Sequence, residues 1–286
     1  MKCFDLFSGC GGFRLGFEKA GFNFIGYSEI DKWAAMLYKN YFNTQNEVYY
    51  NDATKIDTKT MPEFDILLAG FPCQSFSIAG KRKGFEDTRG TLFFDVARIL
   101  KDKRPRYFVL ENVKGLLSHD HGQTFLTIIK TLSDLGYNVE WALLNSKYFG
   151  VSQNRERVFI VGYFGKRSPG KIFPIREITK ANNLKNKKET IIYWKNSREK
   201  WVEEQKKYVG TIKTQSDLCR QPLIKIKNRI RKLTPLECFR LQGFPDDIIT
   251  KAKELNISDA QLYKMAGNSV TVNVIYEIAK RIKYYV

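Results

Sequence analysis

Cys73 is the side chain of this sequence best suited to covalent chemistry. It stands in residues 71–75, Phe-Pro-Cys-Gln-Ser, directly after an apolar run, 64–70, that is typical of a buried strand. The thiol is therefore expected just past a strand end, where open α/β sheets bind their ligands. A basic run at 81–83, Lys-Arg-Lys, follows, and nearby cations lower the pKa of a thiol and make it a stronger nucleophile. The alternative, a small buried hydrophobic residue, fits most free cysteines but not these surroundings.

A second chemical feature is the glycine-rich loop at residues 8–12, Ser-Gly-Cys-Gly-Gly, which follows the first apolar run and precedes a helical pattern. Glycines there allow a tight turn and the close approach of a ligand. Glu29 comes 20 residues after Gly9, at the end of the second expected strand, which suits a carboxylate that binds ribose hydroxyls. The loop and Glu29 predict a nucleotide-type cofactor, but they do not separate a nicotinamide dinucleotide from S-adenosylmethionine.

These residues need a sheet to position them. The first 165 residues alternate short apolar runs with helical patterns, which is typical of a parallel α/β sheet. The expected strands are 3–7, 23–27, 65–69, 107–111, 139–144 and 158–163, and the expected helices are 12–20, 32–41, 91–101 and 123–135. Nearer the end, Thr234 is expected to N-cap a helix, with Pro235 at its first position and Glu237 in a capping box. A last amphipathic helix is expected over 272–283.

The net charge of +18 is concentrated in one segment. Residues 166–232 hold 20 Lys and Arg against 6 Asp and Glu, which is +14 of the total. Such a segment is typical of a protein that binds a polyanion, although a solvated basic surface would have the same composition. Its aromatic residues, which favour a folded module, are Tyr193, Trp194, Trp201 and Tyr208. We therefore predict a catalytic and cofactor-binding domain at 1–165, a small basic domain at 166–232, and a return to the first domain at 233–286.

The composition limits the class of protein. A hydrophobic content of 43% and an aromatic content of 14% predict a globular chain, and no apolar stretch reaches the length of a membrane span. The first expected strand begins so close to Met1 that we expect no signal peptide. The five cysteines, at positions 3, 10, 73, 219 and 238, are odd in number and include no C-x-x-C pair, so we expect neither a disulfide framework nor a metal site. A reducing cytoplasm is the expected location, in a bacterium or, for a viral protein, in the host cell's DNA compartment.

Several stretches resemble one enzyme family. Residues 70–74, Gly-Phe-Pro-Cys-Gln, resemble the signature loop of the cytosine-C5 DNA methyltransferases, in which the cysteine is the nucleophile. The similarity continues through the stretches that follow and is closest to the small bacterial restriction-modification enzymes. The other matching stretches are 7–12, 76–80, 83–95, 111–113, 153–157, 210–212, 233–245 and 267–270. The resemblance implies a DNA (cytosine-5-)-methyltransferase with a Rossmann-like, S-adenosylmethionine-dependent methyltransferase sheet, and it makes the basic segment a small target-recognition domain.

The resemblance also implies a role for each catalytic residue. Cys73 would attack C6 of a flipped-out cytosine, and Glu111 would contact N3 and the exocyclic amine. Glu111 must be protonated to donate to N3, so burial should raise its pKa. Arg155 and Arg157, two apart on an extended segment, would point the same way. One would hold the O2 side of the base and the other would organise the loop or a phosphate, and the family pattern favours Arg157 at O2. The alternatives are a surface carboxylate at a strand end and an exposed basic pair on an edge strand.

The same resemblance assigns binding positions. The cofactor positions are Phe7, Cys10 and Gly12 at the methionine end, Glu29 at the ribose, Ile30 and Asp52 at the adenine, and in addition Ala53, Phe71, Pro72, Leu92, Asn268, Ser269 and Val270. Asp52 has a second interpretation as a helix cap. The expected DNA contacts are Gln74, Ser77, Lys81, Arg82, Lys83, Arg89 and Thr211, although Arg89 could instead support the packing of its own loop.

Two other functions fit the same scaffold. One is a tRNA cytosine-C5 methyltransferase, and the other is a DNA-binding protein without catalysis. The stretch 76–95 favours DNA over tRNA, and the complete set of catalytic residues favours an enzyme. The expected partners are double-stranded DNA and, as a possibility, a companion restriction endonuclease. The chain is expected to act as a monomer.

Overall fold

The computed structural model describes residues 1–72, 92–165, 170–176, 190–194, 201–203, 208–214, 222–226 and 229–285. Cys73 lies outside the described residues. So do six of the seven expected DNA contacts, namely Gln74, Ser77, Lys81, Arg82, Lys83 and Arg89.

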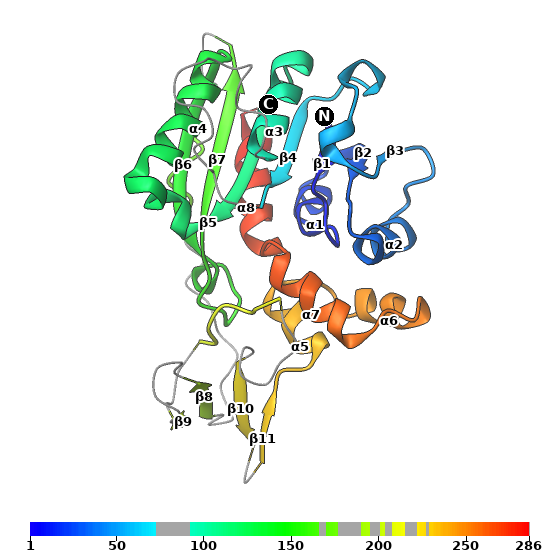
Figure 1. Ribbon diagram of the computed structural model, residues 1–286, viewed down its shortest axis with the longest axis vertical. Coiled ribbons are helices and arrows are strands. Elements are labelled where there is room, and N and C mark those ends of the chain that lie inside the picture. Colours follow the sequence, from blue (N-terminus) through cyan, green and yellow to red (C-terminus); the bar gives the residue numbers. More distant parts are fainter. Residues whose placement is uncertain are drawn as a thin grey trace.

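A seven-stranded sheet, in the order β3-β2-β1-β4-β5-β7-β6, forms the centre of the larger part of the molecule (Figure 1). Its strands are β1 (Lys2–Leu6), β2 (Asn23–Ser28), β3 (Val48–Tyr50), β4 (Ile66–Gly70), β5 (Tyr107–Val113), β6 (Tyr137–Asn145) and β7 (Glu156–Phe164). The first five strands pair in parallel, whereas β7 runs antiparallel to both of its neighbours. The expectation of a parallel sheet is therefore wrong for β7. Only a short connection separates β6 from β7, and a short connection between neighbouring strands forces an antiparallel pair.

Helices cover both faces of this sheet. On one face α1 (Gly12–Lys19) and α8 (Val272–Tyr284) pack against alternate residues of the strands, such as Ile66 and Leu68. On the other face α3 (Leu92–Lys103) and α4 (Gln123–Asp134) pack against the residues between them, such as Leu67 and Ala69. Because successive side chains of a strand point to opposite faces, a strand covered on both sides is apolar throughout.

A third core joins the sheet to the C-terminal helices. These are α5 (Pro235–Leu241), α6 (Asp247–Glu254) and α7 (Asp259–Asn268), and they pack with α2 (Lys32–Tyr41) and with Cys10. The capping box at the start of α5 is confirmed, because the Thr234 hydroxyl accepts from the backbone of Glu237 and the Glu237 carboxylate accepts from the backbone of Thr234. The 3-10 turns that complete the secondary structure are Ala53–Lys55, Thr58–Thr60, Lys114–Leu117, His119–Gly122 and Ser146–Tyr148.

A second, antiparallel sheet lies beyond α5 in Figure 1. It contains β8 (Thr190–Trp194), β9 (Trp201–Glu203), β10 (Leu223–Ile226) and β11 (Arg229–Lys232), in the order β11-β10-β8-β9. All four strands come from the segment that we predict to be the basic domain. Ile172 and Phe173 of the same segment pack in the core of the large sheet instead. The exact domain boundaries stay a prediction.

Two observations on the described residues concern membrane spans and metal ligands. None of their helices is long and apolar enough to cross a membrane. Nor do the described ranges bring three or more His, Cys, Asp or Glu side chains together as metal ligands would be.

Candidate active site

The carboxyl ends of four parallel strands meet at one edge of the large sheet, and each carries residues singled out above. The register aligns Leu6 of β1 with Ser28 of β2 and with Ala69 of β4, and it aligns Gly70 with Glu111 of β5. The glycine-rich loop, Glu29, the start of the cysteine loop and Glu111 therefore share one edge. Ligands of open α/β sheets bind at this edge.

Glu111 forms an ion pair across the antiparallel strands. Arg157 lies opposite Val113 in the register, diagonal to Glu111 on the same face, and its Nε lies 3.0 Å from the Glu111 Oε1. The Glu111 side chain is buried, and this burial raises its pKa, while Arg157 and then Arg155 act in the opposite direction. The expected increase in the pKa of Glu111 is thus confirmed. The alternative of a surface carboxylate is wrong, because the side chain is buried.

Arg155 has different partners from Arg157. It is 2% exposed, and its Nη2 donates to the carbonyls of Gly267 (3.1 Å) and Ser269 (2.7 Å) in the segment that returns to the sheet. Its Nε and Nη1 have no hydrogen-bond partner among the described residues. Burial, together with the charge of Arg157, lowers the pKa of Arg155 to about 9. The two arginines are therefore close in the chain but bind different groups: Arg157 binds the Glu111 carboxylate, and Arg155 binds backbone carbonyls.

The backbone that leads to Cys73 runs beside Glu111. The Asn112 side chain is buried, and its Nδ2 donates to the Phe71 carbonyl at 3.0 Å. A Cβ placed on Gly70 would lie 3.6 Å from the Glu111 Oε2, so this glycine is in close contact with the carboxylate. Pro72 is exposed. Asn112 thus holds the backbone before Cys73, and no role was predicted for it from the sequence, although it directly follows Glu111.

The glycine-rich loop is packed directly on the returning segment. Phe7, Gly9 and Gly11 adopt left-handed backbone conformations with φ values of 58°, 54° and 90°. A Cβ on Gly12 would lie 2.7 Å from the Ser269 Oγ, so only glycine fits there. Cys10 is buried and hydrogen-bonded to Ser269, and burial raises the pKa of its thiol to about 12, which leaves it unreactive.

Glu29 connects the glycine-rich loop to the end of β2 through hydrogen bonds. Its two carboxylate oxygens accept from the backbone of Gly9 and of Asp31, both at 2.7 Å, and burial raises its pKa. Ile30, the next residue, is 68% exposed, which is unusual for an isoleucine. Asp52 caps the 3-10 turn that follows it, because its Oδ1 accepts from the Thr54 backbone at 3.0 Å. The helix-cap interpretation of Asp52 is therefore confirmed, and its contact with adenine stays a prediction.

The remaining cofactor positions are spread around this edge. Ala53 is buried in the turn capped by Asp52, and Leu92 is the first residue of α3. Asn268 ends α7 and is exposed, whereas Ser269 and Val270 are buried against the glycine-rich loop.

Comparison with known proteins identifies the family. The family model for C-5 cytosine-specific DNA methylases matches residues 1–218 and 166–284. The chain belongs to the C-5 cytosine-specific DNA methylases. One relative is the type II methyltransferase M1.ScrFI of Lactococcus lactis subsp. cremoris, which is 42% identical over 98% of this chain and 77% of its own. Another is the type II methyltransferase M.NgoBI of Neisseria gonorrhoeae, which is 42% identical over 96% of this chain and 90% of its own.

Solved structures agree on the fold of this DNA methylase. The Dnmt2 methyltransferase of S. pombe superposes with a TM-score of 0.75 at 18% identity, over 99% of both chains. A putative DNA modification methyltransferase encoded in an E. coli prophage superposes with a TM-score of 0.67 at 19% identity, also over 99% of both. The protein is a DNA cytosine-C5 methyltransferase with the fold of S-adenosylmethionine-dependent methyltransferases, and S-adenosylmethionine is its methyl donor.

The loop edge of the methylase fits this donor. A Cβ on Gly9 would meet no atom within 4 Å, so there is open space beside the loop. Ile30 presents an exposed apolar surface next to the Glu29 carboxylate, as an adenosine would require. The Ser8 hydroxyl is buried and has no partner within the described part of the chain, which leaves a polar group for a ligand.

A buried polar cluster connects the segment of Arg155 and Arg157 to the rest of the chain. Gln153 donates to the Leu241 carbonyl (2.9 Å) and accepts from the Ile212 backbone (3.2 Å). Gln242 donates to the Ala266 carbonyl (2.8 Å) and accepts from the Thr271 hydroxyl (2.8 Å). Both glutamines are fully buried. The cluster holds the arginine segment, α5 and the returning segment in one arrangement.

Thr211 lies next to this cluster. The Thr211 hydroxyl donates to the Asn154 carbonyl at 3.0 Å, so this expected DNA contact lies beside the arginine segment. No role was predicted from the sequence for Gln153 or Gln242. Gln153 opens the matching stretch 153–157, and this position was a usable signal. Nothing in the local sequence distinguishes Gln242 from a surface glutamine.

Replacing Gln242 with leucine is expected to lower the free energy of unfolding by about 2–4 kcal/mol, because it leaves the Ala266 carbonyl and the Thr271 hydroxyl buried without this partner. Urea unfolding of the variant measures the change. The matched control is Asn40→Ala, which removes an exposed side-chain bond to the Met36 carbonyl and should change the free energy by less than about 0.5 kcal/mol. Equal effects of the two variants would show that the cluster adds nothing to stability.

Proposed function

We propose that this protein methylates C5 of a flipped-out cytosine in a short duplex DNA sequence through a covalent bond between Cys73 and C6. The Glu111–Arg157 ion pair, which lies beside the backbone leading to Cys73, is the observation that carries this assignment. The names of the relatives support a role in a restriction-modification system or a related system of DNA marking.

The chemistry begins with the Cys73 thiolate. Its sulfur forms a bond to C6, the C5=C6 double bond is broken, and C5 becomes nucleophilic while negative charge develops on the ring. The bound cofactor supplies the methyl group that C5 accepts. The C5 proton then leaves, for which we assign water as the base, and the C5=C6 bond re-forms as the thiolate is expelled.

Glu111 and Arg157 stabilise the charged ring. Glu111 must take up a proton, which neutralises its ion pair with Arg157, in order to donate a hydrogen bond to N3; burial favours the protonated form and Arg157 opposes it. Arg157, held beside Glu111, provides the cation at O2. Arg155 acts as a positioning residue, because it is bonded to the carbonyls of Gly267 and Ser269.

The cofactor lies at the loop edge of the sheet. The loop of Phe7, Cys10 and Gly12 holds the methionine end, Glu29 holds the ribose, and Ile30 packs on the adenine. The cap to Thr54 uses the Asp52 Oδ1, so the adenine amino group binds the Oδ2, which lies 3.6 Å from the exposed Lys55 Nζ. The remaining contacts come from Ala53, Phe71, Pro72, Leu92, Asn268, Ser269 and Val270.

The DNA lies across the basic segment and the cysteine loop. The target base must leave the duplex, which costs a few kcal/mol and requires contacts that replace stacking. The cationic residues of the loop, Lys81, Arg82, Lys83 and Arg89, contact phosphates, with Gln74, Ser77 and Thr211 nearer the bases. We further propose a cytoplasmic monomer that works beside a companion restriction endonuclease.

The decisive test maps the product. The protein is incubated with unmethylated bacterial genomic DNA and labelled S-adenosylmethionine, and 5-methylcytosine is mapped across the genome, with bacterial tRNA in a parallel reaction. Methylation of DNA at one short motif is expected, and that motif is the recognition site. Label in tRNA alone would move the substrate to RNA, and no label from a protein that binds the cofactor would favour a DNA-binding role without catalysis.

A further inference from the structure

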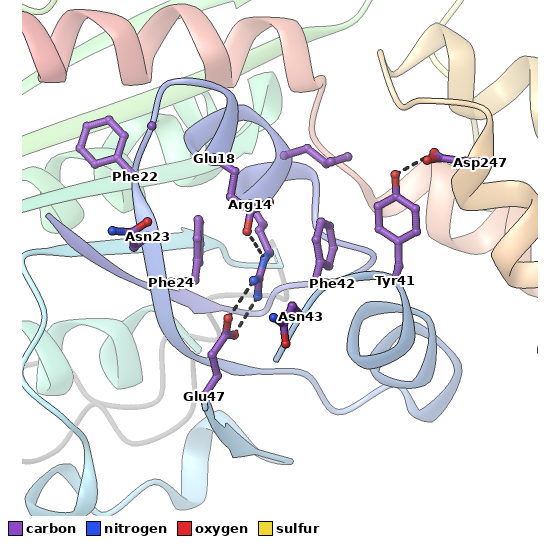
Figure 2. A pocket seen from close by; sticks show the side chains of 12 residues that line it. Arg14, Glu18, Phe22, Asn23, Phe24, Tyr41, Phe42, Asn43, Glu47 and Asp247 are labelled. Carbon is purple, nitrogen blue, oxygen red and sulfur yellow. Dashed lines mark hydrogen bonds and ion pairs between the residues drawn. The ribbon is translucent and has the colours of Figure 1, made fainter. Parts of the chain in front are cut away.

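Arg14 forms a buried cluster on the outer side of α1, beside an open pocket of about 720 Å³ (Figure 2). The guanidinium makes a two-point contact with Glu47, with both N···O distances at 2.7 Å, and its Nε donates to Glu18 at 2.7 Å. Figure 2 shows it between the rings of Phe24 and Phe42, whose centroids lie 5.0 and 4.6 Å from its central carbon. Arg14 is 4% exposed, although it faces the pocket.

The cluster contacts the loop at one point and the strand that leads into it at another. First, a Cβ on Gly11 would lie 2.3 Å from the Phe42 ring, so the backbone of the loop rests directly on the ring that covers Arg14. Second, the Arg14 Nη1 lies 3.4 Å from the Tyr38 hydroxyl, which donates to Asp5 at 3.2 Å. Asp5 belongs to β1, the strand that leads into the loop.

The loop needs such external support. Phe7, Gly9 and Gly11 hold left-handed conformations, and Gly11 is the N-cap of α1 without a side-chain cap bond. Glycine adopts this region without strain, but Phe7 has a side chain, so the surrounding structure must balance the cost of its left-handed backbone. Ser269 and Glu29 contact the loop at Gly12 and Gly9, and Cys10 packs in the third core. Phe42, which covers Arg14, packs on the loop at Gly11.

We propose that Arg14 and Glu47 are positioning residues for the methyl donor: the pair holds the Phe42 ring and α1 so that the backbone of residues 8–12 keeps the shape that binds S-adenosylmethionine. This inference rests on the proposed placement of the cofactor at that loop. Neither residue touches the cofactor or the base. Loss of the pair therefore weakens cofactor binding and leaves both the chemical step and DNA binding intact.

The test must separate positioning from folding. Removing Arg14 alone would leave the buried Glu47 charge without a partner, which can prevent folding. The main variant is therefore the double substitution Arg14→Met with Glu47→Gln, which keeps the volume and removes both charges. Arg14→Lys is the conservative variant, since lysine keeps the charge but cannot make the two-point contact. The matched control is Tyr41→Phe, which removes the hydrogen bond to Asp247 on the rim of the same pocket, away from the loop.

Affinity for S-adenosylmethionine is measured by calorimetry on the DNA-free protein. The double variant is expected to bind about tenfold more weakly, Arg14→Lys to lie between it and the wild type, and Tyr41→Phe to match the wild type. At saturating cofactor, kcat and the KM for DNA should stay within about twofold of the wild type. A folded double variant with unchanged cofactor affinity and a lower unfolding free energy would overturn the inference, because the pair would then only stabilise the fold.

Hydrogen–deuterium exchange separates this inference from the proposed function. S-Adenosylmethionine should protect the amides of residues 8–12 in the wild type, and these amides should exchange faster in the double variant without cofactor. Absence of protection in the wild type would reject the proposed cofactor site itself. Protection in the wild type together with unchanged exchange in the variant would reject only the role of Arg14 and Glu47.

Discussion

Cys73→Ser is expected to reduce methyl transfer by about 10⁴-fold or more and to abolish covalent trapping on DNA that carries 5-fluorocytosine. The thiolate is the attacking species, and a serine hydroxyl does not ionise at neutral pH without a dedicated base. Fluorine at C5 cannot leave as a proton does, so the wild-type enzyme stays bound to C6 after methyl transfer. The variant should still bind S-adenosylmethionine, because the loop at residues 8–12 is unchanged.

Trapping is measured as a complex that survives denaturing electrophoresis. The control is Cys238→Ser, which changes a buried thiol of the third core whose pKa burial raises to about 12. That variant should form the complex as long as it is folded. A complex formed by Cys73→Ser would assign the nucleophile to another residue.

Glu111→Gln is expected to lower the single-turnover rate of methyl transfer by about 10²–10³-fold. Glutamine is a weaker donor to N3 than a protonated carboxyl, and it leaves Arg157 without its ion-pair partner. The control is Glu156→Gln, which breaks only the exposed ion pair with Lys114 and should change the rate by less than about twofold.

The pH profile tests the protonation of Glu111 directly. Burial raises the pKa of this carboxyl, so its protonated form persists above the usual range and is lost as the pH rises through the raised value. The wild-type rate should therefore fall as the pH rises through the raised pKa of Glu111. Glu111→Gln should lose the descending limb. A descending limb that survives in the variant would mean that another group titrates there.

The same shift has a consequence for stability. The folded state holds the Glu111 proton more tightly than the unfolded chain does, so this group stabilises the fold at low pH. The contribution is lost as the pH rises through the raised pKa, and it should be absent in Glu111→Gln.

Helices, strands and caps were predicted closely where the residues that determine them lie next to one another in the sequence. The helix expected at 32–41 is observed as Lys32–Tyr41, because Asp31 caps its backbone and the apolar residues repeat at helical spacing. The expected strand 65–69 is observed as Ile66–Gly70, one residue displaced. The capping box at Thr234 is present for the same reason, since all of its atoms lie within four residues.

Other features depended on distant parts of the chain. The antiparallel direction of β7, the short strand β3 and the helices α6 and α7 were not predicted. Strand direction depends on which neighbours pair in the sheet, and apolar spacing within a strand is the same for either direction. Of the two roles predicted for Asp52, the structure shows the helix cap, and the adenine contact stays a prediction.

The sequence by itself determined the chemical groups of the site and their order along the chain: a glycine-rich loop, a cysteine after a strand, a glutamate on a later strand, and two arginines where the last strand of the sheet begins. These are properties of residue type and short spacing. Only the tertiary structure decided that Arg157 pairs with Glu111 while Arg155 binds the Gly267 and Ser269 carbonyls. The two arginines are only two residues apart. Their roles differ because strand pairing and the return of the chain bring different distant groups within hydrogen-bonding distance of each.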